Sequence, residues 1–182
     1  IPRSQAKTIN LGIFYGMGKN KLSRELGIDK QQAEQILQEY NQRVPFVKQL
    51  ANNAMDAADK NGAIWTLKGR KCRFQEWEPS SFGLHRATTF DDAVQKYGRG
   101  NIKRAYTYKA LNRLIQGSAA DQVKQAMIEC AKAGFYPILQ IHDELCFNLK
   151  WEALAPQYKQ IKEIMETCIP ELKVPSKVDI SI

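Results

Sequence analysis

A short acidic group interrupts an otherwise apolar run late in the sequence. Within residues 138–147, ILQIHDELCF, one histidine and two carboxylates follow one another as His142, Asp143 and Glu144. One interpretation is a solvated turn between two strands, because Asp is a common turn residue. The other is a metal site, in which a strained hairpin tip presents a carboxylate oxygen to a hard divalent cation. This short motif alone leaves both interpretations open.

A second pattern places cations at helical spacing. Arg3, Lys7, Leu11 and Tyr15 recur at intervals of four, so a helix would hold them on one slowly rotating face. A solvated basic stripe that ends in a core aromatic would explain this spacing. Alternatively, two cations one turn apart can hold a polyphosphate, with the Arg fork on terminal oxygens and the Lys ammonium on another phosphate.

The composition is that of a globular protein with an excess of positive charge. The 182 residues are 43% hydrophobic and 25% charged, with a net charge of +8. No apolar run approaches the roughly 18 residues of a membrane span. The basic residues include three separate clusters: Arg3, Lys7, Lys19, Lys21 and Arg24; Lys68, Arg70, Lys71 and Arg73; and Arg99, Lys103, Arg104 and Lys109. Three separated clusters indicate a long anionic partner, and a solvated charged face is the alternative interpretation.

The four cysteines, Cys72, Cys130, Cys146 and Cys168, are far apart and form no Cys-x-x-Cys pair. This spacing argues against a zinc site. We expect them to be reduced, intracellular and mostly buried.

The helices and strands that carry these residues can be predicted from hydrophobic periodicity and from the Gly and Pro residues that end them. We expect helices over residues 2–15, 19–27, 29–44 and 45–61, a hairpin of strands 63–69 and 71–77, and a mobile loop over 78–89. A short helix over 91–97, a long helix over 102–133, strands 136–141 and 145–149, a helix over 151–168 and a closing strand over 177–182 should follow. His85, in the loop, is assigned no role.

Three segments of the sequence resemble motifs of the family A DNA polymerases, the group that includes bacterial DNA polymerase I and many phage replicative enzymes. RSQAKTINLGIFYGMG, residues 3–18, resembles motif B, the finger helix that binds the incoming nucleotide. QIHDEL, residues 140–145, resembles motif C, and ALNRLIQGSAAD, residues 110–121, resembles the palm helix before it. The three segments stand in the family's order and extend over nearly the whole chain.

The resemblance implies nucleotidyl transfer with Mg²⁺ and assigns roles near the reacting groups. Arg3 and Lys7 would hold the triphosphate, and Tyr15 would lie beside the templating base. Asp143 would be a ligand of the catalytic Mg²⁺, with Glu144 supporting the same metal site. The residues expected to be catalytic are therefore Asp143, Glu144 and Lys7.

The resemblance also implies contacts with primer-template DNA. Asn112 and Gln116 would hydrogen-bond the duplex near its minor groove, where the acceptors are nearly independent of sequence. Arg70 would contact a phosphate or the duplex, and His142 would approach the primer terminus.

Three features depart from the family pattern. Leu11 stands where an aromatic residue usually contacts the sugar, and this leaves sugar discrimination open. Tyr108, followed by Lys109, stands where many members have Arg, which weakens one duplex contact. Finally, the acidic strand of motif A, which supplies a second Asp in the family, does not precede motif B in this sequence.

We therefore expect an α+β architecture with a helical fingers portion over residues 1–66. The C-terminal half of a palm, with antiparallel strands packed on a long helix, would occupy 67–182. The expected function is template-directed DNA synthesis from dNTPs on primer-template DNA, in the cytoplasm of a bacterium or of a phage-infected host. The chain alone should be inactive, requiring an N-terminal part that carries motif A, in the same chain or as a split subunit. Self-association through an open sheet edge is also expected.

Two rival functions remain at this point. A basic DNA-binding module without catalysis could retain the motifs as scaffold. A single-subunit RNA polymerase typically has His-Asp-Ser in motif C, so Glu144 argues against it.

Overall fold

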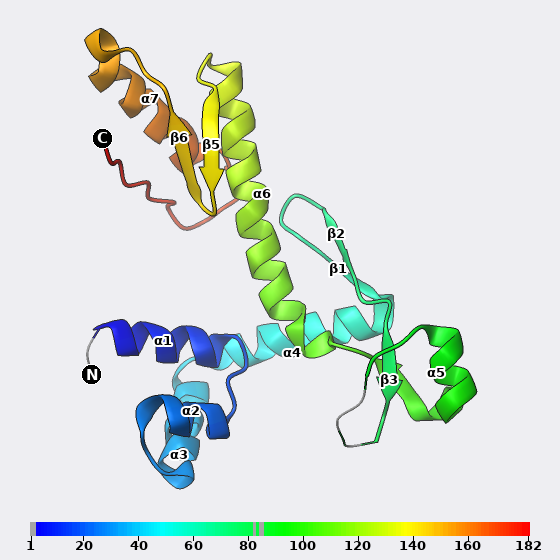
Figure 1. Ribbon diagram of the computed structural model, residues 1–182. Coiled ribbons are helices and arrows are strands. Elements are labelled where there is room, and N and C mark those ends of the chain that lie inside the picture. The colour runs from blue at the N-terminus through cyan, green and yellow to red at the C-terminus, as the bar shows by residue number, and fades with distance from the viewer. Residues whose placement is uncertain (1–2, 82, 84–85) are drawn as a thin grey trace. The chain divides into compact units, whose positions relative to one another are not determined.

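The computed structural model describes residues 3–81, 83 and 86–182 (Figure 1). Pro2 and His85, and with them part of the loop expected to be mobile, lie outside the described residues. The chain folds into two compact units, one containing residues up to 65 and 69–115, the other residues 66–68 and 116–182. The functional division at residue 66 stays a prediction.

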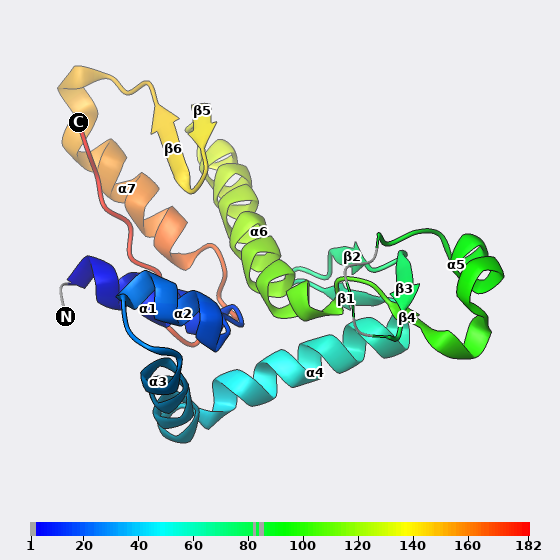
Figure 2. The ribbon, with the colours of Figure 1, turned by 60° about the horizontal axis from the view of Figure 1, so that its bottom comes forward.

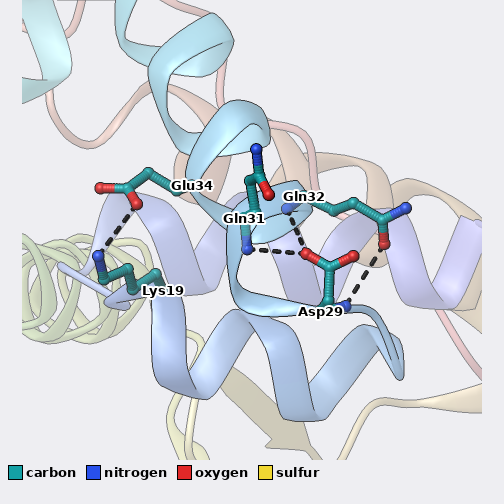
Figure 3. A network of polar contacts seen from close by, with 5 residues as sticks. All are labelled: Lys19, Asp29, Gln31, Gln32 and Glu34. Atoms are coloured by element: carbon teal, nitrogen blue, oxygen red, sulfur yellow. Dashed lines mark hydrogen bonds and ion pairs between the residues drawn. The ribbon is translucent and has the colours of Figure 1, made fainter.

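Four helices open the first unit, as predicted: α1 (Arg3–Phe14), α2 (Lys19–Leu26), α3 (Lys30–Arg43) and α4 (Pro45–Asn61). Asp29 caps α3, since its carboxylate accepts hydrogen bonds of 2.8 Å from the Gln31 and Gln32 amides (Figure 3). Lys19 joins α2 to α3 through a 3.0 Å ion pair with Glu34 (Figure 3). Ile13, Leu22 and Ala33 form the buried core of these first three helices.

A second core in the same unit surrounds the C-terminal half of α4. Small residues let the elements approach closely here: the cluster consists of Ala54, Ala58, Ile64, Phe74, Ala110 and Leu111. It joins α4 to strand β1 (Ala63–Trp65) and to the first turn of helix α6 (Ala110–Lys132). Strand β2 (Lys71–Arg73) pairs with β1 in antiparallel register, so the predicted hairpin is confirmed in shorter form.

The first unit also contains a small sheet that the sequence did not predict. Strand β3 (Trp77–Pro79) pairs antiparallel with β4 (Ile102–Arg104), and helix α5 (Phe90–Tyr97) packs against both. The rings of Trp77 and Phe90 meet edge to face at 4.9 Å. Helix α5 confirms the short helix predicted at 91–97. The first two residues of the predicted loop, 78 and 79, instead belong to β3.

The prediction that the long helix starts at residue 102 is wrong. Residues 102–104 form β4, and η1 (Arg99–Asn101) and η2 (Thr107–Lys109) are single 3₁₀ turns before and after it. The Ala105 amide donates to the Glu76 carbonyl at 2.8 Å, and Tyr106 has φ +61°, which no α-helix accommodates. Pairing with β3 and this backbone conformation together delay the helix to Ala110.

The second unit consists of the remainder of α6, a β-hairpin and helix α7 (Leu154–Thr167), which follows the 3₁₀ turn η3 (Trp151–Ala153). The hairpin pairs β5 (Pro137–Ile141) with β6 (Glu144–Phe147) and lies beside α6 (Figures 1 and 2). The buried core of the second unit consists of Ala126, Cys168 and Ile169, and Leu145 of β6 packs against it. Helices combined with small antiparallel sheets confirm the α+β class. None of the described helices has the length and apolar character needed to cross a membrane.

The closing strand predicted over residues 177–182 is absent. Its backbone groups instead bond to side chains of α7, because the Val178 amide donates to Glu166 at 2.9 Å and the Lys162 ammonium donates to the Val178 carbonyl. The Val178 amide and the Lys162 ammonium lower the pKa of the Glu166 carboxyl. The backbone N–H and C=O groups of Val178 thus have hydrogen-bond partners without a neighbouring strand.

All four cysteines are free, as predicted; Cys130 and Cys168 are buried, and Cys72 and Cys146 are half-buried. Burial raises the pKa of the Cys130 thiol to about 11, so it stays neutral near pH 7.

Arg104 links α4 to the small sheet of the first unit. Its guanidinium donates to the Asp59 carbonyl at 2.8 Å and to the Phe74 carbonyl at 3.0 Å, and lies 4.6 Å from the centre of the Trp77 ring. Gly62 has φ +63°, and a Cβ there would approach the guanidinium carbon to 2.9 Å. The close approach of Arg104 therefore requires glycine at position 62.

Replacing Arg104 with Ala should lower the free energy of unfolding by about 2–3 kcal/mol, because two carbonyls lose a charged donor. Urea unfolding followed by circular dichroism measures the loss, with the exposed Arg99→Ala as the matched control, which should change stability by less than about 0.5 kcal/mol. Equal effects of the two substitutions would show that Arg104 does not join these elements.

Candidate nucleotide, metal and nucleic-acid sites

The first helix exposes one face and buries the opposite one. Ile13 is buried and Ile9 packs against the same core, so the direction of the apolar stripe is fixed. Positions two residues from Ile9 point the other way around a helix, because each residue turns by about 100°. Arg3, Lys7 and Leu11 are accordingly exposed. The predicted shared face is present for these three residues, whereas Tyr15 lies beyond the end of α1 and is half-buried.

The end of α1 is held by backbone hydrogen bonds. The Tyr15 amide donates to the Leu11 carbonyl at 3.0 Å, and the Met17 amide donates to the Gly12 carbonyl at 2.7 Å. A Cβ at Gly12 would overlap the terminal methyl of Met17, so a larger residue there would require the Met17 side chain to move. Tyr15 therefore follows the helix in a fixed turn and is half-buried.

An open groove of about 310 Å³ is lined in part by Leu11, one of the predicted nucleotide-binding residues. Its lining comes from α1, α3, the α3–α4 junction and α4: Asn10, Leu11, Tyr40, Val44, Phe46 and Val47. The Tyr40 hydroxyl donates to Asn10 Oδ1 at 3.0 Å and joins α3 to α1. Sequence analysis missed Asn10 and Tyr40, because only the fold brings residues thirty positions apart together.

The acidic group lies at the tip of the β5–β6 hairpin, as both the solvated-turn and the metal-site interpretations require. Ile141 pairs with Glu144, so His142 and Asp143 form a two-residue turn. His142 has φ +55°, a conformation typical of the first central residue of tight hairpin turns and uncommon for non-glycine residues. The Gln140 side-chain amide donates to the His142 carbonyl at 3.1 Å and holds the turn.

Both carboxylates of this tip are exposed, with Asp143 in the turn and Glu144 in β6. Carboxylate oxygens suit a hard cation such as Mg²⁺, so the donor set fits the expected metal. Within residues 3–81, 83 and 86–182, however, no three His, Cys, Asp or Glu side chains gather closely enough to form a complete metal site. This tip can therefore supply only part of the ligand set of a metal ion.

The predicted DNA contacts are exposed on two elements. Arg70 is exposed near the tip of the β1–β2 hairpin, where the Lys71 ammonium lies 5.4 Å from the centre of the Trp65 ring. Asn112 and Gln116 are exposed one turn apart on α6. Exposure is compatible with the predicted contacts, and their roles stay predictions.

Several cations of the predicted basic clusters are engaged within the protein. Lys68 pairs with Glu171 at 3.5 Å, Lys103 pairs with Glu78 at 3.5 Å, and Arg104 bonds to backbone carbonyls. The surface available to an anionic partner is therefore smaller than the sequence indicated.

Comparison with known proteins identifies the family. The family model described as DNA polymerase family A matches residues 2–182. This chain belongs to DNA polymerase family A, which confirms the resemblance drawn from its motifs.

Individual relatives agree with this assignment. The chain is 33% identical over 216 aligned residues to a DNA-directed DNA polymerase of Pseudomonas phage M6, an alignment that covers 100% of the chain and 29% of the relative. It is 30% identical over 184 residues to the thermostable DNA polymerase I of Thermus filiformis, covering 99% of the chain and 20% of the relative. With DNA polymerase I of Geobacillus stearothermophilus it shares 31% over 183 residues, covering 97% and 19%.

A solved structure shows the same fold. The POL domain of Pol1 from M. smegmatis, in complex with DNA primer-template and dNTP, superposes with a TM-score of 0.73 at 28% identity. The match covers 95% of this chain and 28% of that one. The chain thus spans less than a third of the length of these relatives.

Proposed function

We propose that this chain provides the nucleotide-binding helix and one metal-binding carboxylate of a template-directed DNA polymerase. The observation that carries the proposal is the outward face of α1, where Arg3 and Lys7 are exposed opposite the buried Ile13 and the partly buried Ile9. Family membership and the complex of the M. smegmatis relative with primer-template and dNTP support DNA and dNTPs as partners.

The reaction joins the primer 3′ oxygen to the α-phosphorus of a dNTP, while the bond to the leaving pyrophosphate breaks. Lys7 would neutralise charge on a phosphate and Arg3 would clamp terminal oxygens through its planar fork. Tyr15 would lie beside the templating base, and Leu11 would meet the sugar at the edge of the 310 Å³ groove. These residues would bind and orient the nucleotide.

The hairpin tip would contribute the metal ligands of this chain. Asp143, in the two-residue turn, would bind Mg²⁺ directly, and Glu144 would support the same site from β6. Bound Mg²⁺ neutralises phosphate charge and activates the primer hydroxyl. Two-metal transfer requires further bridging carboxylates, and the described residues contain no third ligand nearby. We therefore infer that activity requires a segment supplying another carboxylate.

The duplex would be held without sequence preference. Arg70 would contact phosphate, Asn112 and Gln116 would reach degenerate acceptors in the minor groove, and His142 would approach the primer end. In functional terms, residues 1–66 would act as fingers and residues 67–182 as part of the palm.

The nucleotide role of α1 can be tested on the chain itself with the fluorescent nucleotide mant-dATP. Lys7→Ala should weaken binding about tenfold to a hundredfold, because one charge-assisted phosphate contact is lost. Lys30→Ala, an exposed lysine at the start of α3, is the matched control and should leave affinity unchanged. If Lys7→Ala weakens duplex binding but leaves mant-dATP affinity intact, a non-catalytic DNA-binding module becomes the better account.

The two carboxylates of the hairpin tip should contribute unequally to metal binding. Adjacent residues leave the turn in different directions, so we expect Asp143→Asn to abolish Mn²⁺ binding measured by electron paramagnetic resonance and Glu144→Gln only to weaken it. Asp56→Asn, at an exposed position in the middle of α4, controls for loss of one negative charge. A larger loss for Glu144→Gln would reverse the assignment.

A further inference from the structure

A cluster of two tyrosines and a lysine precedes α6, with Tyr108 and Lys109 exposed and Tyr106 half-buried. Tyr106, Tyr108 and Lys109 lie in and just before η2, between β4 and α6. The Tyr106 and Tyr108 rings meet edge to face with centres 6.5 Å apart and planes at 61°. The Lys109 ammonium lies 4.7 Å from the centre of the Tyr106 ring and 5.6 Å from that of Tyr108. We refer to these three residues as the tyrosine cluster.

The cluster is held firmly although it is exposed. Ala105 and Ala110, on either side of it in sequence, are buried, with 1% and 0% exposure. Between them, the Lys109 amide donates to the Tyr106 carbonyl at 2.9 Å and η2 packs against α4. Tyr106 takes φ +61°, a conformation rare for a bulky residue, which the anchored ends maintain. The segment therefore holds Tyr108 and Lys109 at the surface in one fixed arrangement, with Tyr106 half-buried beside them.

The exposure of the Tyr108 ring and of the Lys109 ammonium is not explained by the stability of the fold. The Tyr108 side chain is 66% exposed, although an aromatic ring gains most from burial. Lys109 is also exposed, and it forms no ion pair with a carboxylate of the described residues. An exposed ring beside an uncompensated ammonium can stack a nucleobase and meet its phosphate together.

We propose that the tyrosine cluster binds an unpaired nucleotide of a DNA strand, with the base stacked on Tyr108 and its phosphate at Lys109. The Tyr106 ring contacts both the Tyr108 ring and the Lys109 ammonium and helps to hold them in place. The proposal rests on the proposed function in that DNA is the partner, and it adds a preference for single-stranded over paired DNA. Paired bases expose only edges in the grooves, so a duplex gives Tyr108 no base face except at its ends.

The test compares the chain with its variants by fluorescence anisotropy, using a labelled single-stranded oligonucleotide and a blunt hairpin duplex closed by a non-nucleotide linker. Tyr108→Ala should weaken single-strand binding by about tenfold or more and leave duplex binding within about twofold. Tyr108→Phe keeps the ring and should bind as the parent chain does. Tyr136→Ala removes a tyrosine of similar exposure, 71%, and should have no effect on either probe.

Salt dependence separates stacking from charge. Lys109→Gln should weaken single-strand binding and reduce its dependence on salt, whereas Tyr108→Ala should leave that dependence unchanged. Equal losses for both probes with Tyr108→Ala, no loss, or no single-strand binding by the parent chain would each overturn the proposal. Binding of mant-dATP is measured separately. If only this inference fails, the chain still binds mant-dATP. If the nucleotide role of α1 fails, the chain does not bind mant-dATP.

Discussion

The close packing of α4 against β1 and the start of α6 determines most of the first unit. Alanines at positions 54, 58 and 110 are each almost fully buried, and their small side chains allow the three backbones to approach. A larger residue at Ala58 or Ala110, both with 0% exposure, would have to displace a neighbouring element. This contact positions the end of α4, where the Arg104 guanidinium reaches two backbone carbonyls. The strained segment that carries the tyrosine cluster is anchored in this packing at its C-terminal end, through Ala110.

Charge placement follows from which faces are buried. The apolar stripe of α1 leaves Arg3 and Lys7 facing outward, and the register of β5 and β6 leaves Asp143 in a two-residue turn. Exposed cations and exposed carboxylates cost little while they are hydrated, and each gains when a ligand of opposite charge binds. The proposed nucleotide-binding and metal-binding groups of this chain are thus exposed to solvent.

Helix boundaries in the first third were predictable because specific residues mark them. Asp29 caps α3, and Gly27 and Gly62 take the left-handed conformation that ends α2 and α4. The β3–β4 pair was not predictable, since strands of three residues carry no periodic signal and Trp77 meets Arg104 only across a long sequence separation. Residues 177–182 have the alternating pattern of a strand, yet their partners are side chains of α7, which no local pattern reveals.

The candidate sites divide in the same way. The hairpin tip could be predicted because apolar strands flank the acidic group, and the face of α1 because its spacing is helical. The groove beside Leu11 and the tyrosine cluster could not, since both depend on contacts between distant residues and on the positive φ of Tyr106. Family resemblance supplied the roles, and the fold supplies the exposure and geometry on which tests of those roles depend.

The central claim is that this chain holds only part of the carboxylate set for nucleotidyl transfer. Primer extension by the purified chain, alone and mixed with a polypeptide carrying the acidic palm strand of a family A polymerase, tests it most directly. The account predicts no extension by the chain alone and extension by the mixture. Extension by the chain alone that disappears in Asp143→Asn would contradict it, because other residues of this chain would then complete the metal site.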